Sequence, residues 1–306
     1  MILEVPEHLS HSQSDNLVGP YCPASLYYGR YLGKPERPGW AQLGGSALHE
    51  SSEAWDWGLI EDGIVDDSPE RLSALFNAAF DKQIAEREAQ TSYPKSEWYS
   101  SGRVIQSKVT MDGGPEKKSE SWWRQMGPEM LRLWAGWRLN SPWEIAVLDD
   151  QGRTVHGIEV ALETTFGGRP WRGYIDRVFE KDGEFLLVDL KTGKEPDGAA
   201  QNGAYRVALL RKYGVNARWG AFWLGSKGVS TSLVDLQQRW PEEKVEYRYA
   251  KADAIRMAGA FVHRPSNMCV SCSVKDYCAE FGGERAAETP QPWEVSEVRI
   301  ASAERS

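Results

Sequence analysis

The sequence predicts an α/β protein, in which a mixed central sheet is flanked by helices and preceded by a helical insertion. Ile158, Val160 and Leu162 alternate with polar residues, which is the pattern of a half-buried strand. Residues 185–190 are almost wholly apolar, as expected for a central strand that is buried on both faces. Apolar side chains after Ser68 instead recur on one helical face, which predicts a helix before the sheet begins.

The same signals order the remaining elements. The expected helices cover about 45–57, the stretch from Pro69 capped by Ser68, 122–137 with a break near Gly127 and Pro128, 199–212 capped by Asp197 and ended by Gly214, and 250–261. The expected strands cover about 158–162, 171–180, 185–190 and 219–224, with hairpin turns at Gly167-Gly168 and Asp182-Gly183. Residues 91–120 are expected to be a long polar loop. This order divides the chain into an N-terminal segment (1–60), a helical insertion (61–140), a core (141–230), a C-terminal helix with clustered cysteines (231–282) and a flexible tail (283–306).

Composition excludes few classes of function. The chain has 306 residues, 41% of them hydrophobic, and the formal net charge is −8, which is unusual for a nucleic-acid-binding protein. The charge is uneven, however, because residues 169–218 hold ten Lys/Arg and seven Asp/Glu, a local +3 that leaves −11 elsewhere. The start of the chain does not resemble a signal peptide and no apolar run is long enough to cross a bilayer, so we expect a cytoplasmic protein without membrane contact.

Acidic and basic side chains occur where a purely structural core would not need them. Asp176 lies within one expected strand, and Asp189 and Lys191 end the next, where their spacing places both on one face. A buried charge is costly unless it is paired or bound to a metal, and Mg²⁺ and Mn²⁺ prefer such oxygen ligands. The alternative is that Asp189 and Lys191 form an edge salt bridge and that Asp176 belongs to a solvated turn.

The order of these residues along the chain resembles a known family. A Gly-x-x-x-His run ends at His49, Gly173-x-x-Asp176 follows, then Asp189-x-Lys191, and finally Gln201-x-x-x-Tyr205 on one helical face. These motifs, in this order, resemble the RecB-type branch of the PD-(D/E)xK nuclease superfamily. The resemblance covers residues 45–205 and leaves 61–150 without a motif. It implies a restriction-endonuclease-like core.

The resemblance also implies a role for each residue. Asp176 and Asp189 would bind Mg²⁺ or Mn²⁺, together with His49 and the carbonyl of Leu190. Lys191 would position or activate the attacking water, while Gln201 and Tyr205 would support the site or hold the strand being cut. Glu159 and Glu53 are weaker candidates, and His49 could instead be a buried structural histidine.

The four cysteines form a second pattern. Cys269, Cys272 and Cys278 lie within ten residues, whereas Cys22 is separated from them by 246 residues. Clustered thiolates suit zinc or an iron–sulfur cluster, and unligated core thiols are a third alternative. The arrangement resembles the nuclease domain of AddB and the CRISPR-associated exonucleases with four cysteines. That resemblance implies a [4Fe–4S] cluster that joins the two ends of the chain.

Together these patterns predict a metal-dependent DNA exonuclease that acts on single strands or DNA ends in recombination, repair or processing. The alternative is a non-catalytic iron–sulfur module that binds DNA or assists assembly. The sequence has no Gly-x4-Gly-Lys-Ser/Thr phosphate loop, so the protein is not expected to be a helicase itself. A helicase or recombination partner could therefore supply unwinding.

Overall fold

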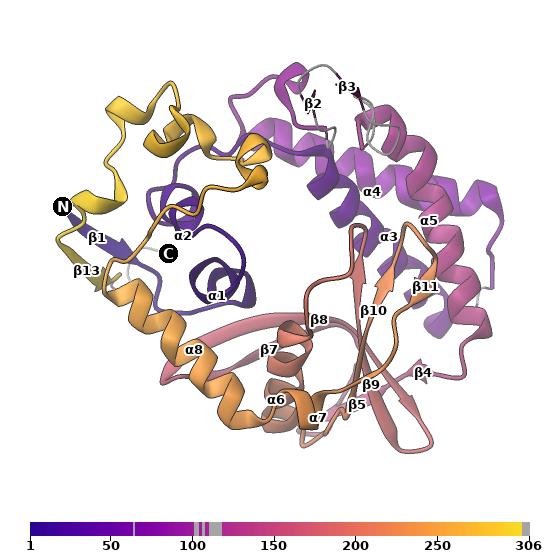
Figure 1. The fold of residues 1–306 in the computed structure, drawn as a ribbon. Helices are drawn as coiled ribbons and strands as arrows, with labels where there is room; N and C mark the ends of the chain where they lie inside the picture. Colours follow the sequence, from indigo (N-terminus) through magenta and orange to yellow (C-terminus); the bar gives the residue numbers. More distant parts are fainter. Residues whose placement is uncertain (64, 101–103, 106–107, 110–117, 302–306) are drawn as a thin grey trace.

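The computed structural model describes residues 1–63, 65–100, 104–105, 108–109 and 118–301. Figure 1 shows a central sheet with helices on both faces and the two chain ends close together. The helices are α1 His11–Val18, α2 Pro23–Leu26, α3 Trp40–Glu61, α4 Pro69–Gln90, α5 Glu120–Asn140, α6 Ala200–Tyr213, α7 Leu236–Arg239 and α8 Glu242–Met257. The strands are β1 Ile2–Val5, β2 Val104–Ile105, β3 Lys108–Val109, β4 Glu144–Ile145, β5 Val147–Asp150, β6 Arg153–His156, β7 Ile158–Phe166, β8 Arg169–Lys181, β9 Glu184–Lys191, β10 Trp219–Leu224, β11 Val229–Ser230, β12 Val234–Asp235 and β13 Glu297–Ile300.

The central sheet contains both strand orientations. Its strands follow the order β11-β10-β9-β8-β4, with β7 paired to β8 and β12 to β10. Strand β9 runs parallel to β10, and the helix α6 makes the crossover between them, while β8 is antiparallel to both β7 and β9. The prediction of a mixed sheet with a central, buried third strand is therefore confirmed.

The two faces of the sheet pack against different helices. Leu186, Val188 and Leu190 of β9 join a core with side chains of α3, α4 and α5. Leu187, on the opposite face, joins a core with side chains of α6. Because side chains alternate along a strand, Asp189 lies on the same face as Leu187 and is directed toward α6.

The two ends of the chain form a third packed region. Strand β1 pairs in parallel with β13, with Ile2 opposite Glu297. Side chains near both ends, among them Leu3, Val5 and Val298, are buried with residues of α2 and α8. The tail predicted to be flexible contains the strand Glu297–Ile300, because alternating apolar residues there find a partner strand that is distant in sequence. Residues 302–306 lie outside the described residues.

Two predicted helices have different boundaries in the structure. The helix expected at 250–261 is α8, which begins at Glu242 and ends at Met257. Pro241 precedes its first turn, and Glu242 and Glu243 favour the positive end of the helix dipole, so the start signal lies earlier than we predicted. Helix α6 ends at Gly214 as predicted, but its N-cap is Ala199, and Asp197 makes no cap.

The predicted break in α5 does not occur, because the helix runs continuously through Pro128. Gly127 lies against the ring of Phe76 so closely that a Cβ atom would come within 2.0 Å of its Cζ. This tight packing against α4 holds the helix together despite the hydrogen bond that Pro128 cannot make.

The stretch predicted as a loop at 91–120 contains the short helical turn Lys95–Glu97, and part of it lies outside the described residues. Among the helices that the structure describes, none is long and apolar enough to cross a membrane.

Candidate active site

Asp176 and Asp189 come together on neighbouring strands. The antiparallel pairing of β8 with β9 places Arg177 opposite Val188, so the two aspartates are adjacent across the same strand pair. Both carboxylates are buried, and the Oδ2 atom of Asp176 accepts a hydrogen bond of 2.6 Å from the backbone N–H of Leu190. The alternative that Asp176 belongs to a solvated turn is therefore inconsistent with its position.

The Asp189 carboxylate is buried without a well-oriented hydrogen bond. Its Oδ2 lies 2.6 Å from Nζ of Lys191 in an ion pair, but neither oxygen meets the geometry of a hydrogen bond. Lys191 continues toward α6, where its Nζ lies 3.4 Å from Oε1 of Gln201, and Nε2 of Gln201 donates to the hydroxyl of Tyr205 at 2.8 Å. Four of the residues singled out in the sequence thus form one continuous chain of contacts.

His49 reaches the same place from α3. Its Nε2 lies 3.1 Å from the carbonyl oxygen of Leu190, and since a carbonyl can only accept, this nitrogen carries the proton. Its Nδ1 is directed at the acids, 3.4 Å from Oδ1 of Asp176 and 4.0 Å from Oε1 of Glu159. The side chain is 30% exposed and faces carboxylates, so it is not a histidine enclosed in the apolar core.

Glu159 occupies a more central position than its sequence context indicated. Ligand atoms of His49, Glu159 and Asp176 all lie within 4.8 Å of one another. The backbone at Glu159 has a φ of +46°, which is strained for a residue with a side chain, and such strain is common at functional sites. A glutamate inside a strand that is otherwise alternating was the available signal, but only the fold shows that it meets Asp176.

The charges perturb one another strongly. Burial would lower the pKa of His49, but Asp176, Glu159 and Asp189 outweigh it and raise the pKa to about 9. Burial and the charge of Asp176 raise the pKa of Glu159 to about 7 and that of Asp189 to about 6. Burial would also raise the pKa of Asp176, but His49 and Lys191 lower it on balance. Three carboxylates therefore share the positive charge of His49 and Lys191. A divalent cation would add the positive charge that this cluster lacks.

The donor set fits Mg²⁺ or Mn²⁺. Asp189 is paired with Lys191 through Oδ2 but its Oδ1 has no donor among the described residues, and His49, Glu159 and Asp176 offer three more atoms at close range. Hard divalent cations bind such oxygen-rich sets, and Mn²⁺ also accepts imidazole. In this structure the Leu190 carbonyl accepts from His49 and so orients the histidine, and its second lone pair can still bind the cation, as the motif resemblance implies.

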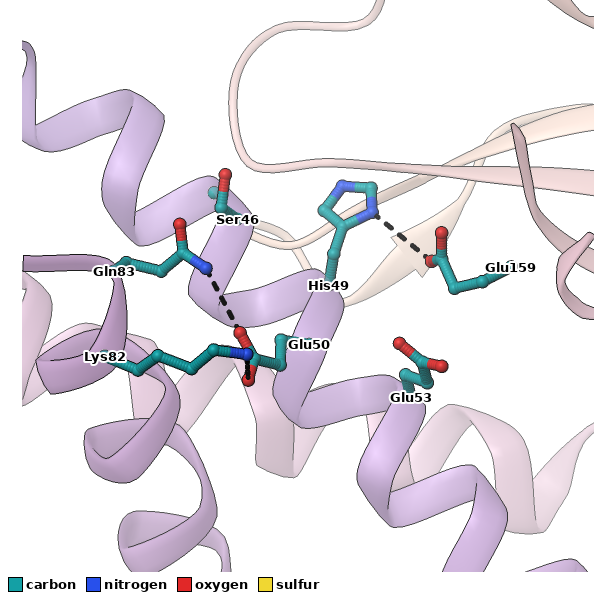
Figure 2. Close-up of a pocket in the computed structure, with 8 residues that line it drawn as sticks. Ser46, His49, Glu50, Glu53, Lys82, Gln83 and Glu159 are labelled. Atoms are coloured by element: carbon teal, nitrogen blue, oxygen red, sulfur yellow. Dashed lines mark hydrogen bonds and ion pairs between the residues drawn. The ribbon is translucent and has the colours of Figure 1, made fainter. Parts of the chain in front are cut away.

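A pocket of about 570 Å³ opens beside this cluster. Figure 2 shows His49 and Glu159 on one side of it, with Glu53 one helical turn further along α3. On the other side, Lys82 and Gln83 of α4 both contact the carboxylate of Glu50, at 2.8 and 3.1 Å. Of the side chains that could hold a cation, His49 and Glu159 thus line a polar opening.

The four cysteines form no disulfide and are all half-buried. Burial raises the pKa of Cys272 to about 11, and the nearby thiols of Cys22, Cys278 and Cys269 add to the rise, so the four sulfurs lie within electrostatic range. No three of these sulfur atoms, all of them described, lie within 4.8 Å of one another. Backbone N–H groups donate to two of them, from Arg264 to Cys22 and from Ser266 to Cys269.

Comparison with known proteins identifies the family of the chain. A family model described as the PD-(D/E)XK nuclease superfamily matches residues 8–279. The chain belongs to this superfamily. The matched range includes Cys22, His49, the three residues Asp176, Asp189 and Lys191, and all of the C-terminal cysteines.

Individual relatives of this superfamily member come from bacteriophages. The Gene 69 protein of Mycobacterium phage L5 is 26% identical over 253 residues, which are 78% of this chain and 84% of the relative. The Gene 69 protein of Mycobacterium phage D29 is 29% identical over 187 residues, 54% of this chain and 68% of the relative. A crystal structure of a candidate exonuclease from Eubacterium rectale is 12% identical, with a TM-score of 0.42 over 87% of each chain.

Proposed function

We propose that the protein is a metal-dependent DNA exonuclease of the RecB-type branch of its superfamily. The observation that carries this proposal is the convergence of Asp176, Asp189 and Lys191, on the neighbouring strands β8 and β9, with His49 of α3. An acidic cluster with an unsatisfied carboxylate favours a divalent cation, and the adjacent ammonium group is placed to act on a nucleophile or phosphate.

Each side chain has a role that its position supports. Asp176, Asp189, Glu159 and His49 would hold the cation, which when bound lowers the pKa of a water and polarises a phosphoryl oxygen. Lys191 remains cationic because Asp189 and Asp176 raise its pKa despite burial, so it can orient the water and offset charge that develops on the phosphate. Gln201 and Tyr205 brace Lys191 from α6.

A [4Fe–4S] cluster held by Cys22, Cys269, Cys272 and Cys278 is the second part of the proposal. The thiol of Cys272 is close enough to those of Cys22, Cys269 and Cys278 for all three to affect its pKa, so cysteines from both ends of the chain gather in one region. Four such thiolates suit an iron–sulfur cluster, in which each thiolate binds a different iron.

The test is digestion of end-labelled DNA by anaerobically purified protein. We expect single-stranded DNA or DNA ends to be degraded to short products with Mn²⁺ or Mg²⁺ and to remain intact with EDTA. Circular single-stranded DNA should resist, because an exonuclease needs an end. Cleavage of the circle would indicate an endonuclease. Binding without degradation under all of these metal conditions would favour the alternative, a non-catalytic iron–sulfur module that assists a helicase or recombination partner.

A further inference from the structure

A buried ionic network lies directly behind the acidic cluster and meets the pocket at Glu159. Arg177, which follows Asp176 on β8, is fully buried. Its Nε donates to Oδ2 of Asp56 at 2.7 Å, and its Nη2 donates to the hydroxyl of Ser52 at 3.1 Å. Two residues of α3 therefore bind two of the three guanidinium nitrogens. The remaining nitrogen donates to the backbone oxygen of Asp176 at 2.6 Å and lies 3.4 Å from Oε1 of Glu159.

Helix α5 completes this network. Asp56 is also fully buried, and it accepts from two more donors, Nε of Arg138 at 3.0 Å and the indole N–H of Trp134 at 3.2 Å. Two arginines therefore share one buried aspartate, so one positive charge is left to be balanced by the acidic cluster, where both Asp176 and Glu159 act on Arg177. Glu159 is the carboxylate that meets this charge, through Arg177. A buried charge that is left unpaired is costly, so the network attracts the ionised carboxylate of Glu159.

We infer that Arg177 is a positioning residue that holds Glu159 for the cation, and that α3 and α5 hold Arg177 from behind. The inference rests on the proposed metal site, and it assigns to α5, part of the predicted insertion, a function in that site. Groups that orient metal ligands typically change metal affinity by about 10- to 100-fold when they are replaced. A guanidinium suits the role because its planar fork presents five donors in fixed directions, whereas an ammonium group has three donors that rotate freely.

The chain contains a matched control for a purely structural arginine. Arg256 is also fully buried, pairs with Asp253, and donates to the backbone oxygen of Pro6 at 2.7 Å. It therefore resembles Arg177 in burial and partners, but its contacts tie α8 to the N-terminal segment. Replacing either arginine by lysine removes a comparable set of buried contacts, and only Arg177→Lys changes a contact to Glu159.

The experiment measures Mn²⁺ binding to the full, cluster-bearing chain by electron paramagnetic resonance of free Mn²⁺, without DNA. We expect Arg177→Lys to raise the Mn²⁺ Kd by about 10-fold or more, and Arg256→Lys to leave it within about 2-fold. In a Glu159→Gln background, Arg177→Lys should have little further effect, because the two residues act through one contact. Equal effects of the two arginine variants, or full additivity with Glu159→Gln, would overturn the inference.

Two further variants keep the test decisive. If Arg177→Lys does not fold, Ser52→Ala removes one anchor of the same guanidinium with little loss of volume, and it should raise the Kd a few-fold only when Glu159 is present. If the effect of Ser52→Ala on the Kd does not depend on Glu159, the inference is overturned.

Asp176→Asn tests the metal site itself. If it binds Mn²⁺ like wild type, the proposed function fails; if it loses Mn²⁺ while Arg177→Lys does not, only the inference about Arg177 fails.

Discussion

The acidic cluster and the cysteine cluster are built in opposite ways. His49, Glu159, Asp176 and Asp189 lie on a long helix and three paired strands. The four cysteines lie at the start of a four-residue helix and on short helical turns near the other end of the chain, and each is half-buried. The fold therefore holds the acidic residues in long, regular elements, whereas the cysteines lie on short helical segments. We conclude that ligand binding should affect catalysis at the first site and stability at the second.

The largest expected effect is on catalysis at the acidic cluster. Lys191→Ala should reduce metal-dependent DNA degradation on the order of 10³-fold, because it removes the cation next to the reacting groups. The unfolding temperature should change little, since β9 and its apolar neighbours remain. Gel assays with end-labelled DNA and thermal unfolding measure the two effects. Lys212→Ala, on the exposed side of α6, is the control, and digestion by Lys191→Ala at the wild-type rate would show that the assigned site is wrong.

The second prediction concerns the cysteine cluster. Cys22→Ala should lose the iron and the acid-labile sulfide as completely as Cys278→Ala does, and lower the free energy of unfolding by about 4 kcal/mol, the size expected for a link that closes a long loop. Metal analysis and denaturant unfolding under anaerobic conditions measure both. Met268→Ala, an exposed residue beside Cys269, should keep the metal.

Two other results of the metal analysis would change the assignment of the cysteine cluster. A colourless wild type with stoichiometric zinc would replace the iron–sulfur cluster by the alternative metal and keep the link between the ends. Complete retention of metal by Cys22→Ala would instead show that the C-terminal cysteines form a local site with another fourth ligand.

The smallest expected effect is on Mn²⁺ binding by His49, and it tests whether a ligand of the acidic cluster can be removed without loss of stability. His49→Ala should weaken Mn²⁺ binding about 10- to 100-fold, with partial rescue of activity at raised Mn²⁺. Its free energy of unfolding should change by less than about 1 kcal/mol, because the side chain is partly exposed and faces polar groups. His156→Ala, whose ring packs edge-on against Trp57, serves as the control. A large loss of stability with unchanged activity would make His49 a structural histidine.

Local patterns predicted the parts of the fold that depend on short segments. The strands β7 to β10, the helix that starts at Pro69 and the glycine that ends α6 follow from periodicity and from turn and cap residues. The motif order also brought Asp176, Asp189, Lys191, Gln201 and Tyr205 into one hypothesis before any contact was known. Superfamily membership is consistent with that order.

Tertiary structure decided what depends on residues far apart in the sequence. Strand β13 has too few apolar residues to form alone and exists because β1 lies beside it. Helix α5 continues through Pro128 because Phe76 packs against Gly127. From the sequence alone, Arg177 is an ordinary strand residue. Its role depends on Asp56 and Glu159, which contact it from a separate helix and a separate strand. A sequence specifies which side chains are charged, but only packing determines which charges are buried together, and burial sets the strength of their interaction.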